Sequence, residues 1–193
     1  ILQDMGVAAS SIKVIHNGTY LDKFDINFDR KKFRECLGIK DNDLLFISIG
    51  RNNTVKGYSF AIKSFSKIKD KSKVKYYIFG RNVKDLQCLV DESHLQDNVI
   101  LNNSIVGDDL IKTYKSADAY ILPSYIEGFP LTKAEALAAG LPVITSNRPG
   151  CIDNIKHGYN GLIAEERDEA SFSREIEAVL SNRKLLDSMK TNA

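Results

Sequence analysis

The chain has 193 residues, with 27 basic and 25 acidic side chains and a formal net charge of +2. Because these charges nearly balance, they produce no long-range field that would gather a polyanion, which argues against a nucleic-acid partner. Hydrophobic residues make up 43% and charged residues 27% of the chain, as in soluble globular proteins, and the length suits one α/β domain. No apolar run approaches the roughly 20 residues of a transmembrane helix.

The cysteines and the two ends indicate the setting of the chain. Cys36, Cys88 and Cys151 are far apart and lack metal-ligand spacing, which is typical of reduced thiols in a cytosol. No charged-then-apolar leader resembles a signal peptide, so a cytoplasmic location is expected. The chain begins without Met in a helix-like pattern and stops within another. Residues 1–193 are therefore expected to be a single-domain piece of a longer protein.

Apolar runs alternate with amphipathic stretches along the chain. The run "LLFISIG" is continuous and closed by glycine, which is typical of a strand buried on both faces. Helical spacing of apolar residues appears first at 58–69. The pattern predicts strands at 12–15, 44–50, 75–80, 98–101, 118–123, 142–146 and 161–164. It predicts helices at 58–69, 83–94, 109–117, 132–140 and 169–180.

Strands that alternate with helices predict a Rossmann-like α/β fold, a mostly parallel sheet with helices on both faces. Open sheets of this kind bind ligands beyond the carboxyl ends of their strands. The segments that follow the predicted strands are therefore the places to look for a functional site.

The first such segment is "GRNNTVKG" at 50–57. Gly50 lets the backbone turn tightly after the strand, and Arg51 and Lys56 would project over the ligand edge of the sheet. An arginine fork and a lysine point charge suit the oxygens of a diphosphate, and they could offset charge on a leaving phosphate. A solvated turn with two ordinary basic residues is the alternative.

The segment "EGFPL" at 127–131 precedes a helix predicted to begin near Thr132. Backbone N–H groups without partners make a helix start a site for anions. Phosphate oxygens could bind the amides around Leu131 and Thr132. Glu127 could accept hydrogen bonds from sugar hydroxyls, and Glu135 could accept them from a vicinal diol such as ribose.

Other polar features have structural interpretations. "TKAE" fits a capping box in which Thr132 is the N-cap and Glu135 folds back to its amide, and this alternative for Glu135 stays open. "DND" at 41–43 precedes a strand and is expected to be a turn with self-capping side chains. The three histidines have no zinc-ligand spacing, so no metal site is expected.

Five stretches occur in the order seen in one enzyme family: "VIHNG" (14–18), "GRNNTVKG" (50–57), "YIFGRN" (77–82), "SADAYILPSYIEGFPLTKAEALAAGLPVITS" (116–146) and "HGYNGLI" (157–163). Together they resemble the carboxy-terminal half of the retaining glycosyltransferases with two Rossmann-like domains, the GT-B type (family 4, group 1). The two glutamates separated by seven residues, Glu127 and Glu135, are the most specific part of the match.

The resemblance implies a domain that binds a nucleotide sugar, a UDP- or GDP-sugar. It implies that the whole protein transfers the sugar to an acceptor hydroxyl with retention at the anomeric carbon, in surface polysaccharide or glycolipid synthesis. The enzyme would be cytoplasmic and peripheral at the inner face of the membrane. The acceptor, a glycan or lipid, would bind an amino-terminal domain that residues 1–193 lack, as they lack a final C-terminal helix.

By the same resemblance, Arg51 and Lys56 hold the diphosphate in place of a metal, so neither metal nor cofactor is expected. The residues implied in catalysis are Glu127, Arg51 and Lys56. The residues implied in donor binding are Gly50, Arg51, Lys56, Ile105, Val106, Glu127, Gly128, Phe129, Pro130, Leu131, Thr132 and Glu135.

The chain departs from the family pattern in the stretches that would meet the base and the donor. Asn103 and Ser104 stand where the family usually shows a glycine, Asn82 replaces a turn glycine, and Pro130 removes one amide donor. Two other readings remain open, a nucleotide-sugar epimerase of similar fold and a non-catalytic nucleotide-sugar binding module. The isolated piece is expected to bind donor weakly and to transfer nothing alone.

Overall fold

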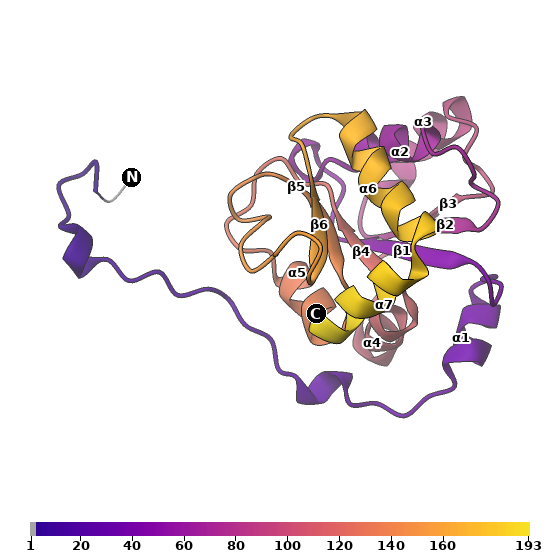
Figure 1. Cartoon of the computed structure of the whole chain (residues 1–193), viewed down its shortest axis with the longest axis horizontal. Coiled ribbons are helices and arrows are strands. Elements are labelled where there is room, and N and C mark those ends of the chain that lie inside the picture. The colour runs from indigo at the N-terminus through magenta and orange to yellow at the C-terminus, as the bar shows by residue number, and fades with distance from the viewer. Residues whose placement is uncertain (1–2) are drawn as a thin grey trace.

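The computed structural model describes residues 3–193 (Figure 1). Its centre is one sheet of six parallel strands in the order β3-β2-β1-β4-β5-β6. The strands are β1 (Leu44–Ile49), β2 (Val74–Phe79), β3 (Val99–Asn102), β4 (Ala119–Leu122), β5 (Val143–Ser146) and β6 (Gly161–Ala164). The predicted Rossmann-like parallel sheet is confirmed.

The helices connect and cover the strands. They are α1 (Arg30–Cys36), α2 (Tyr58–Ser66), α3 (Gln87–Glu92), α4 (Gly107–Ser116), α5 (Leu131–Ala138), α6 (Glu169–Ser181) and α7 (Arg183–Asn192). Short 3-10 turns lie at η1 (Ala9–Ser11), η2 (Asp22–Phe24), η3 (Thr54–Lys56) and η4 (Val83–Leu86). Each predicted helix is present, although the one at 83–94 is split between η4 and α3.

The sheet has an apolar core on each face. Successive strand side chains point to opposite faces, so Phe46 packs with α2, α6 and α7 in one cluster, whereas Ile47 packs with α4 and α5 in the other. Burial on both faces explains why β1 is apolar at every position except Ser48, whose hydroxyl donates to the carbonyl of Ile121 at 2.6 Å. The predicted helices on both faces are confirmed.

The strand order changes direction beside β1. From β1 the chain moves outward through β2 and β3, and then returns to place β4 on the other side of β1. The connections that leave β1 and β4 therefore run in opposite directions, and the crevice between them is where open α/β sheets bind ligands. These connections are residues 50–57, called here the β1 loop, and residues 123–130, called the glutamate turn.

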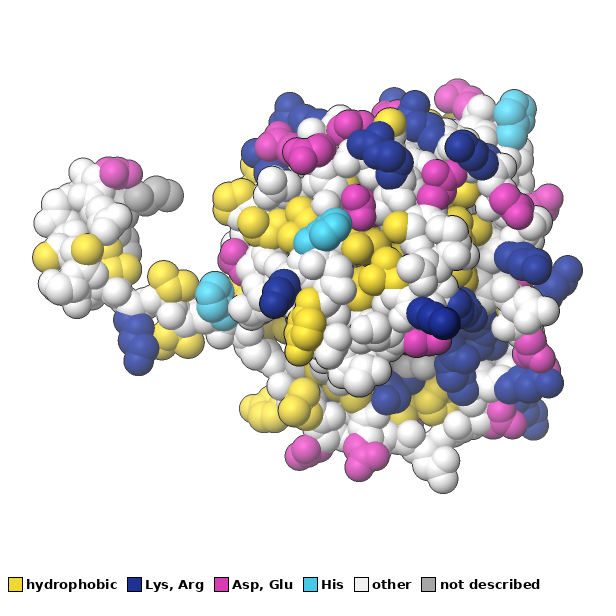
Figure 2. Space-filling model, in the orientation of Figure 1, with side chains coloured by type: hydrophobic (Ala, Val, Ile, Leu, Met, Phe, Trp, Pro, Cys, Tyr) yellow, Lys and Arg dark blue, Asp and Glu magenta, His cyan; other side chains and the backbone are white. Residues whose placement is uncertain are grey.

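The strand predicted at 12–15 is wrong. Residues 3–21 form an arm that leaves the body of the domain, with η1 as its helical turn (Figure 1). Within residues 3–193 this segment pairs with no strand, and a strand requires a hydrogen-bonded neighbour. Val14 and Ile15 of this segment are 73% and 81% exposed, and Figure 2 shows apolar side chains along the arm.

Candidate functional site

The β1 loop packs directly on the glutamate turn. Gly57 has φ +66°, and a Cβ there would lie 2.0 Å from the carbonyl oxygen of Pro123, so only glycine allows this approach. The backbone N–H of Tyr125 donates to the carbonyl of Val55 at 2.8 Å. The side chain of Asn53 accepts from the N–H of Lys56 at 3.0 Å and caps η3. These contacts fix where the Lys56 side chain starts.

Lys56 and Glu127 meet across the crevice. The Lys56 Nζ lies 2.7 Å from Glu127 Oε1, with 26% of the lysine side chain and 13% of the glutamate side chain exposed. The structure thus brings together two of the three residues expected to be catalytic. The third, Arg51, is exposed, and within residues 3–193 its side chain forms no hydrogen bond or ion pair.

Glu135 lies on the second turn of α5 and is held from other elements. Its Oε1 pairs with Lys23 Nζ at 2.7 Å, and its Oε2 accepts from the Tyr114 hydroxyl at 3.0 Å. The capping-box interpretation is wrong, because α5 begins at Leu131 with Pro130 as its N-cap and no side chain caps it. Thr132 lies inside the helix, so Glu135 has no cap to fold back to.

The start of α5 has free hydrogen-bond donors. Within residues 3–193, four backbone N–H groups at this helix start donate to no protein acceptor, those of Gly128, Phe129, Leu131 and Thr132. Pro130 has no N–H to add. Such N–H groups, together with the helix dipole, favour an anion. They lie in the same turn as Glu127, which faces Lys56.

The other expected donor residues lie along the same edge of the sheet. Gly50 ends β1, where its N–H donates to Phe79 at 2.9 Å. Ile105 and Val106 follow β3, which is two strands from β1 in the sheet. Val106 is 78% exposed, whereas Ile105 packs against the second core.

Three lysine and tyrosine contacts at the site were missed from the sequence. Lys23 and Tyr114 bind Glu135, and Lys133, which is fully buried, holds the residues after β5. Lys23 is 112 residues from Glu135 in the sequence, and Lys133 donates to residues 17 to 20 positions away. No local pattern encodes contacts between residues so far apart in the sequence. A lysine on the inner face of a predicted helix does, however, indicate a buried ammonium that needs acceptors.

Several structural turns agree with the sequence analysis. Asn82 has φ +61°, as its place in a glycine-type turn predicts. In "DND", the Asp43 carboxylate accepts from the N–H of Lys40 at 2.9 Å.

Among residues 3–193, no three His, Cys, Asp or Glu side chains come together in a way that could hold a metal ion.

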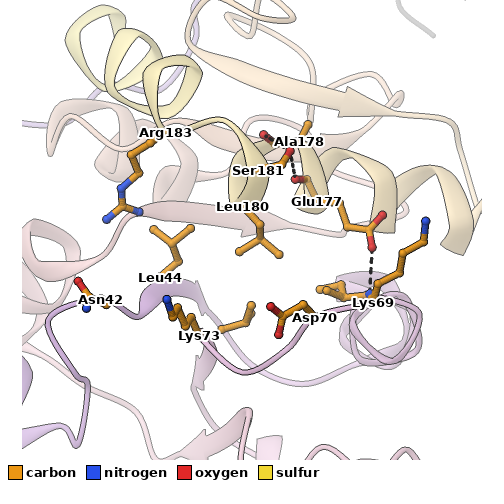
Figure 3. A pocket seen from close by; sticks show the side chains of 12 residues that line it. Asn42, Leu44, Lys69, Asp70, Lys73, Glu177, Ala178, Leu180, Ser181 and Arg183 are labelled. Carbon is orange, nitrogen blue, oxygen red and sulfur yellow. Dashed lines mark hydrogen bonds between the residues drawn. The ribbon is translucent and has the colours of Figure 1, made fainter.

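A separate groove of about 770 Å³ lies at the amino ends of β1 and β2, opposite the carboxyl ends that carry the β1 loop and the glutamate turn. It is lined by Leu44 and Val74, at the starts of β1 and β2, and by Glu177, Leu180 and Arg183 of α6 and α7. Figure 3 labels Leu44 and the three helix residues. It contains no residue of the β1 loop or of the glutamate turn. None of the helices in the described part of the chain is long and apolar enough to cross a membrane.

Comparison with known proteins identifies the family. The model of the family "Glycosyl transferases group 1" matches residues 29–193. The chain belongs to the group 1 glycosyltransferases. The match covers the whole sheet together with the β1 loop and the glutamate turn, and it favours a transferase over the epimerase that the sequence left open.

Two curated relatives illustrate the likeness in sequence. An uncharacterised glycosyltransferase of Methanocaldococcus jannaschii is 33% identical over 89% of this chain and 45% of its own length. The N,N'-diacetylbacillosaminyl-diphospho-undecaprenol alpha-1,3-N-acetylgalactosaminyltransferase of Campylobacter jejuni is 28% identical over 100% of this chain and 51% of its own. The chain thus spans about half the length of these relatives.

The fold of this chain matches about half of a larger solved structure. Anabaena HepE, crystallised in complex with UDP, superposes with a TM-score of 0.87 at 20% identity. The superposition covers 98% of this chain and 53% of HepE. At this identity the likeness supports the architecture of the group 1 domain rather than the roles of single residues.

Proposed function

We propose that this chain is the donor-binding half of a retaining glycosyltransferase of family 4, of the GT-B type. The whole enzyme transfers a sugar from a UDP- or GDP-sugar to an acceptor hydroxyl. The bond between the anomeric carbon and the diphosphate breaks, and a bond from that carbon to the acceptor oxygen forms on the same face of the ring. The proton of the acceptor hydroxyl passes to the leaving diphosphate. The observation that carries the proposal is the contact of Lys56 with Glu127 at the switch point of the sheet.

The cations and the helix start serve the diphosphate. Arg51 and Lys56 bind its oxygens and offset the negative charge that grows on the leaving phosphate. The free N–H groups of Gly128, Phe129, Leu131 and Thr132 donate to the remaining oxygens. The unpaired Arg51 side chain supports this role, because an exposed guanidinium can turn to a ligand without breaking another contact. The reaction requires no metal in this proposal.

The two glutamates bind the two sugars of the donor, the transferred sugar and the ribose. Glu127 accepts hydrogen bonds from hydroxyls of the transferred sugar, and Lys56 keeps its carboxylate facing the diphosphate. Glu135 accepts from the ribose diol in exchange for its contact with Lys23, which is 33% exposed and can move into solvent. Gly50 gives the ligand close access to β1, and Ile105 and Val106 lie against the base.

The acceptor is bound by an amino-terminal domain, and it is a glycan or a lipid-linked sugar. The Campylobacter relative carries a diphospho-undecaprenol acceptor in its name, which supports a lipid-linked acceptor and surface polysaccharide or glycolipid synthesis. We place the enzyme in the cytoplasm, peripheral at the inner face of the membrane.

The first test uses this chain and titrates it with uridine and guanosine diphosphates in a calorimeter. K56M and R51M are expected to weaken nucleotide binding by about tenfold each, the scale of a charge-assisted contact. K63M is the matched control, since Lys63 is an exposed lysine on α2. Equal affinities for K56M and K63M would contradict the role of Lys56.

The second test uses the full-length protein with a panel of nucleotide sugars and lipid-linked acceptors. E127Q is expected to abolish transfer, EDTA to leave it unchanged, and the product to keep the anomeric configuration of the donor by NMR. The 193-residue chain is expected to transfer nothing. Full-length protein that interconverts donor sugars without an acceptor would instead be an epimerase, and one that binds donor without turnover would be a binding module.

A further inference from the structure

Lys133 is a fully buried lysine in the first turn of α5. Its Nζ donates to three backbone carbonyls, those of Gly150 at 2.6 Å, Asp153 at 2.8 Å and Cys151 at 3.2 Å. All three belong to residues 147–154, called here the β5 loop. An ammonium group has three donors, and here each has an acceptor. A buried charge is tolerated only when it is satisfied in this way.

The same ammonium contacts the glutamate turn. It lies 4.3 Å from the centre of the Phe129 ring, which is cation–π distance. Phe129 is two residues after Glu127 and carries one of the free N–H groups of the helix start. The Lys133 side chain therefore contacts both the β5 loop and the segment that includes Glu127.

The β5 loop in turn supports the backbone of Glu127. Gly150 has φ +79°, and a Cβ there would lie 2.1 Å from the carbonyl oxygen of Glu127, so the two backbones are in direct contact. The Cys151 Sγ lies 3.6 Å from the carbonyl of Ser124. Glu127 is thus supported on one side by the β1 loop and on the other by the β5 loop.

Apart from the β1 and β5 loops, the arm also contacts the glutamate turn: Asn17 Nδ2 donates to the carbonyl of Phe129 at 3.1 Å, and the His16 ring lies 4.7 Å from the Phe129 ring. Within residues 3–193, none of the N–H groups from 126 to 129 donates to a backbone acceptor. A segment without such bonds keeps its shape only through contacts with its neighbours. Burial lowers the pKa of the Lys133 ammonium, while the charge of Asp153, and then that of Glu127, acts against this.

We propose that Lys133 is a positioning residue of the donor site, which holds the β5 loop and the glutamate turn together and thereby fixes Glu127 and the amides of the helix start. The proposal rests on the proposed function for its consequence, since a donor needs this geometry. Lys133 itself touches no donor. An apolar side chain would fill the same space but leave three carbonyls without this donor, two of them buried and that of Asp153 partly buried.

Hydrogen–deuterium exchange of this chain tests the clamp without any ligand. K133M is expected to speed exchange about tenfold at the amides of positions 125, 133 and 134, which flank the glutamate turn, and of positions 148, 151 and 152, with β1 and β4 unchanged. These amides donate to backbone carbonyls and can therefore lose protection. K133R keeps the charge and several donors, and it is expected to restore most of the protection. K63M, on the exposed face of α2, is expected to change nothing. Unchanged exchange in both segments, or an equal rise throughout the sheet, would overturn the clamp.

A second variant covers the case in which K133M does not fold. F129L removes the ring that faces the ammonium and, with it, the contact of that ring with His16. At this half-buried position it is expected to speed exchange at positions 125, 133 and 134 in the same way, though less. Protection in F129L equal to that of the unchanged chain would then count against the proposal.

Function gives the second measurement. In the full-length protein, K133M is expected to raise the donor KM and the nucleoside diphosphate Kd about tenfold, with both recovering in K133R. If the unchanged chain and full-length protein bind neither diphosphate, the proposed function fails, and with it the donor role of Lys133. Exchange still decides whether the lysine holds the turn. Faster exchange with unaltered KM and Kd would overturn the positioning role alone.

Discussion

Replacing Asp118 by asparagine is predicted to destabilise the fold far more than the same change at the surface. The Asp118 carboxylate precedes β4 and is 3% exposed. It lies 2.8 Å from Lys190 Nζ on α7 and 3.2 Å from Arg34 Nη1 on α1. The backbone N–H of Leu45, at β1, donates to it at 2.9 Å. One carboxylate thus joins two helices and two strands.

The size of the effect follows from burial. Asparagine keeps the shape but removes the negative charge, and Arg34, itself 5% exposed, then has only neutral acceptors. Removing one partner of a buried ion pair costs about 3–5 kcal/mol. A chain of this length loses about 2–4 °C in melting temperature per kcal/mol, so D118N is expected to melt about 6 to 20 °C lower.

The matched control is D41N, followed by thermal unfolding at pH 7. Asp41 also pairs with a cation, Lys31 at 3.2 Å, but both side chains are about two-thirds exposed. An exposed pair of this kind contributes little, so D41N is expected to leave the melting temperature unchanged. Equal melting temperatures for the two variants would refute the assignment of the effect to burial.

The dependence on pH has a defined sign. Burial by itself raises the pKa of Asp118, but the charges of Lys190 and Arg34 and the N–H of Leu45 outweigh it, and the pKa lies below its usual range. A carboxyl with a lowered folded pKa contributes stability above its unfolded pKa, about 4, and loses it as the pH falls further. The difference in melting temperature between the unchanged chain and D118N is expected to become smaller below pH 4. A constant gap down to pH 3 would contradict this.

Three further substitutions and reactions test other contacts. G57A is expected to destabilise the chain and to weaken nucleotide binding, because its Cβ meets a carbonyl oxygen. The control is G107A, which is also at positive φ but has open space around it, and it should lower the free energy of unfolding by only about 1 kcal/mol. Equal losses in the two variants would refute the packing argument. Burial raises the pKa of Cys151 to about 11, so with Ellman's reagent at pH 8 it is expected to react about tenfold or more slowly than the two exposed cysteines, and equal rates would show that the site opens readily. Y114F removes the hydroxyl donor to Glu135, and calorimetry is expected to show about fivefold weaker nucleoside diphosphate binding; unchanged affinity would separate Tyr114 from the ribose site.

The sheet could be predicted from the sequence because each strand carries its own signal. A strand buried on both faces is apolar throughout, as Phe46 and Ile47 in β1 illustrate. The alternation with helices then requires parallel strands, and parallel strands place their following loops at one edge. The meeting of Lys56 with Glu127 follows from that topology once the order of β1 and β4 is given.

The parts that could not be predicted depend on partners distant in the sequence. α1 was missed because its buried residue is Arg34, which a hydrophobic pattern reads as an outward position, and its partner Asp118 is 84 residues away. Lys133 lies within "TKAE", where the capping-box interpretation gave roles only to Thr132 and Glu135, so the burial of its side chain was not predicted. The apolar run at 12–15 has the composition of a strand but no neighbouring strand within residues 3–193.

Cation–carboxylate pairs lie before and after β4, and the two sets differ in how deeply the cations are buried. The deeply buried pair has a structural role, whereas the more exposed pairs can take part in ligand binding. Before β4, Asp118 and Arg34 have side chains only 4% and 6% exposed, so neither can exchange its partner for water or a ligand without a large cost. After β4, the cations Lys56 and Lys23 are 26% and 33% exposed. Each lysine can move into solvent, but Glu127 and Glu135 are only 13% and 18% exposed, so each carboxylate gives up its lysine only in exchange for another hydrogen-bond donor. The pairs at the carboxyl edge can therefore open to admit polar groups of a ligand, whereas the pair at the amino edge holds the sheet that aligns them.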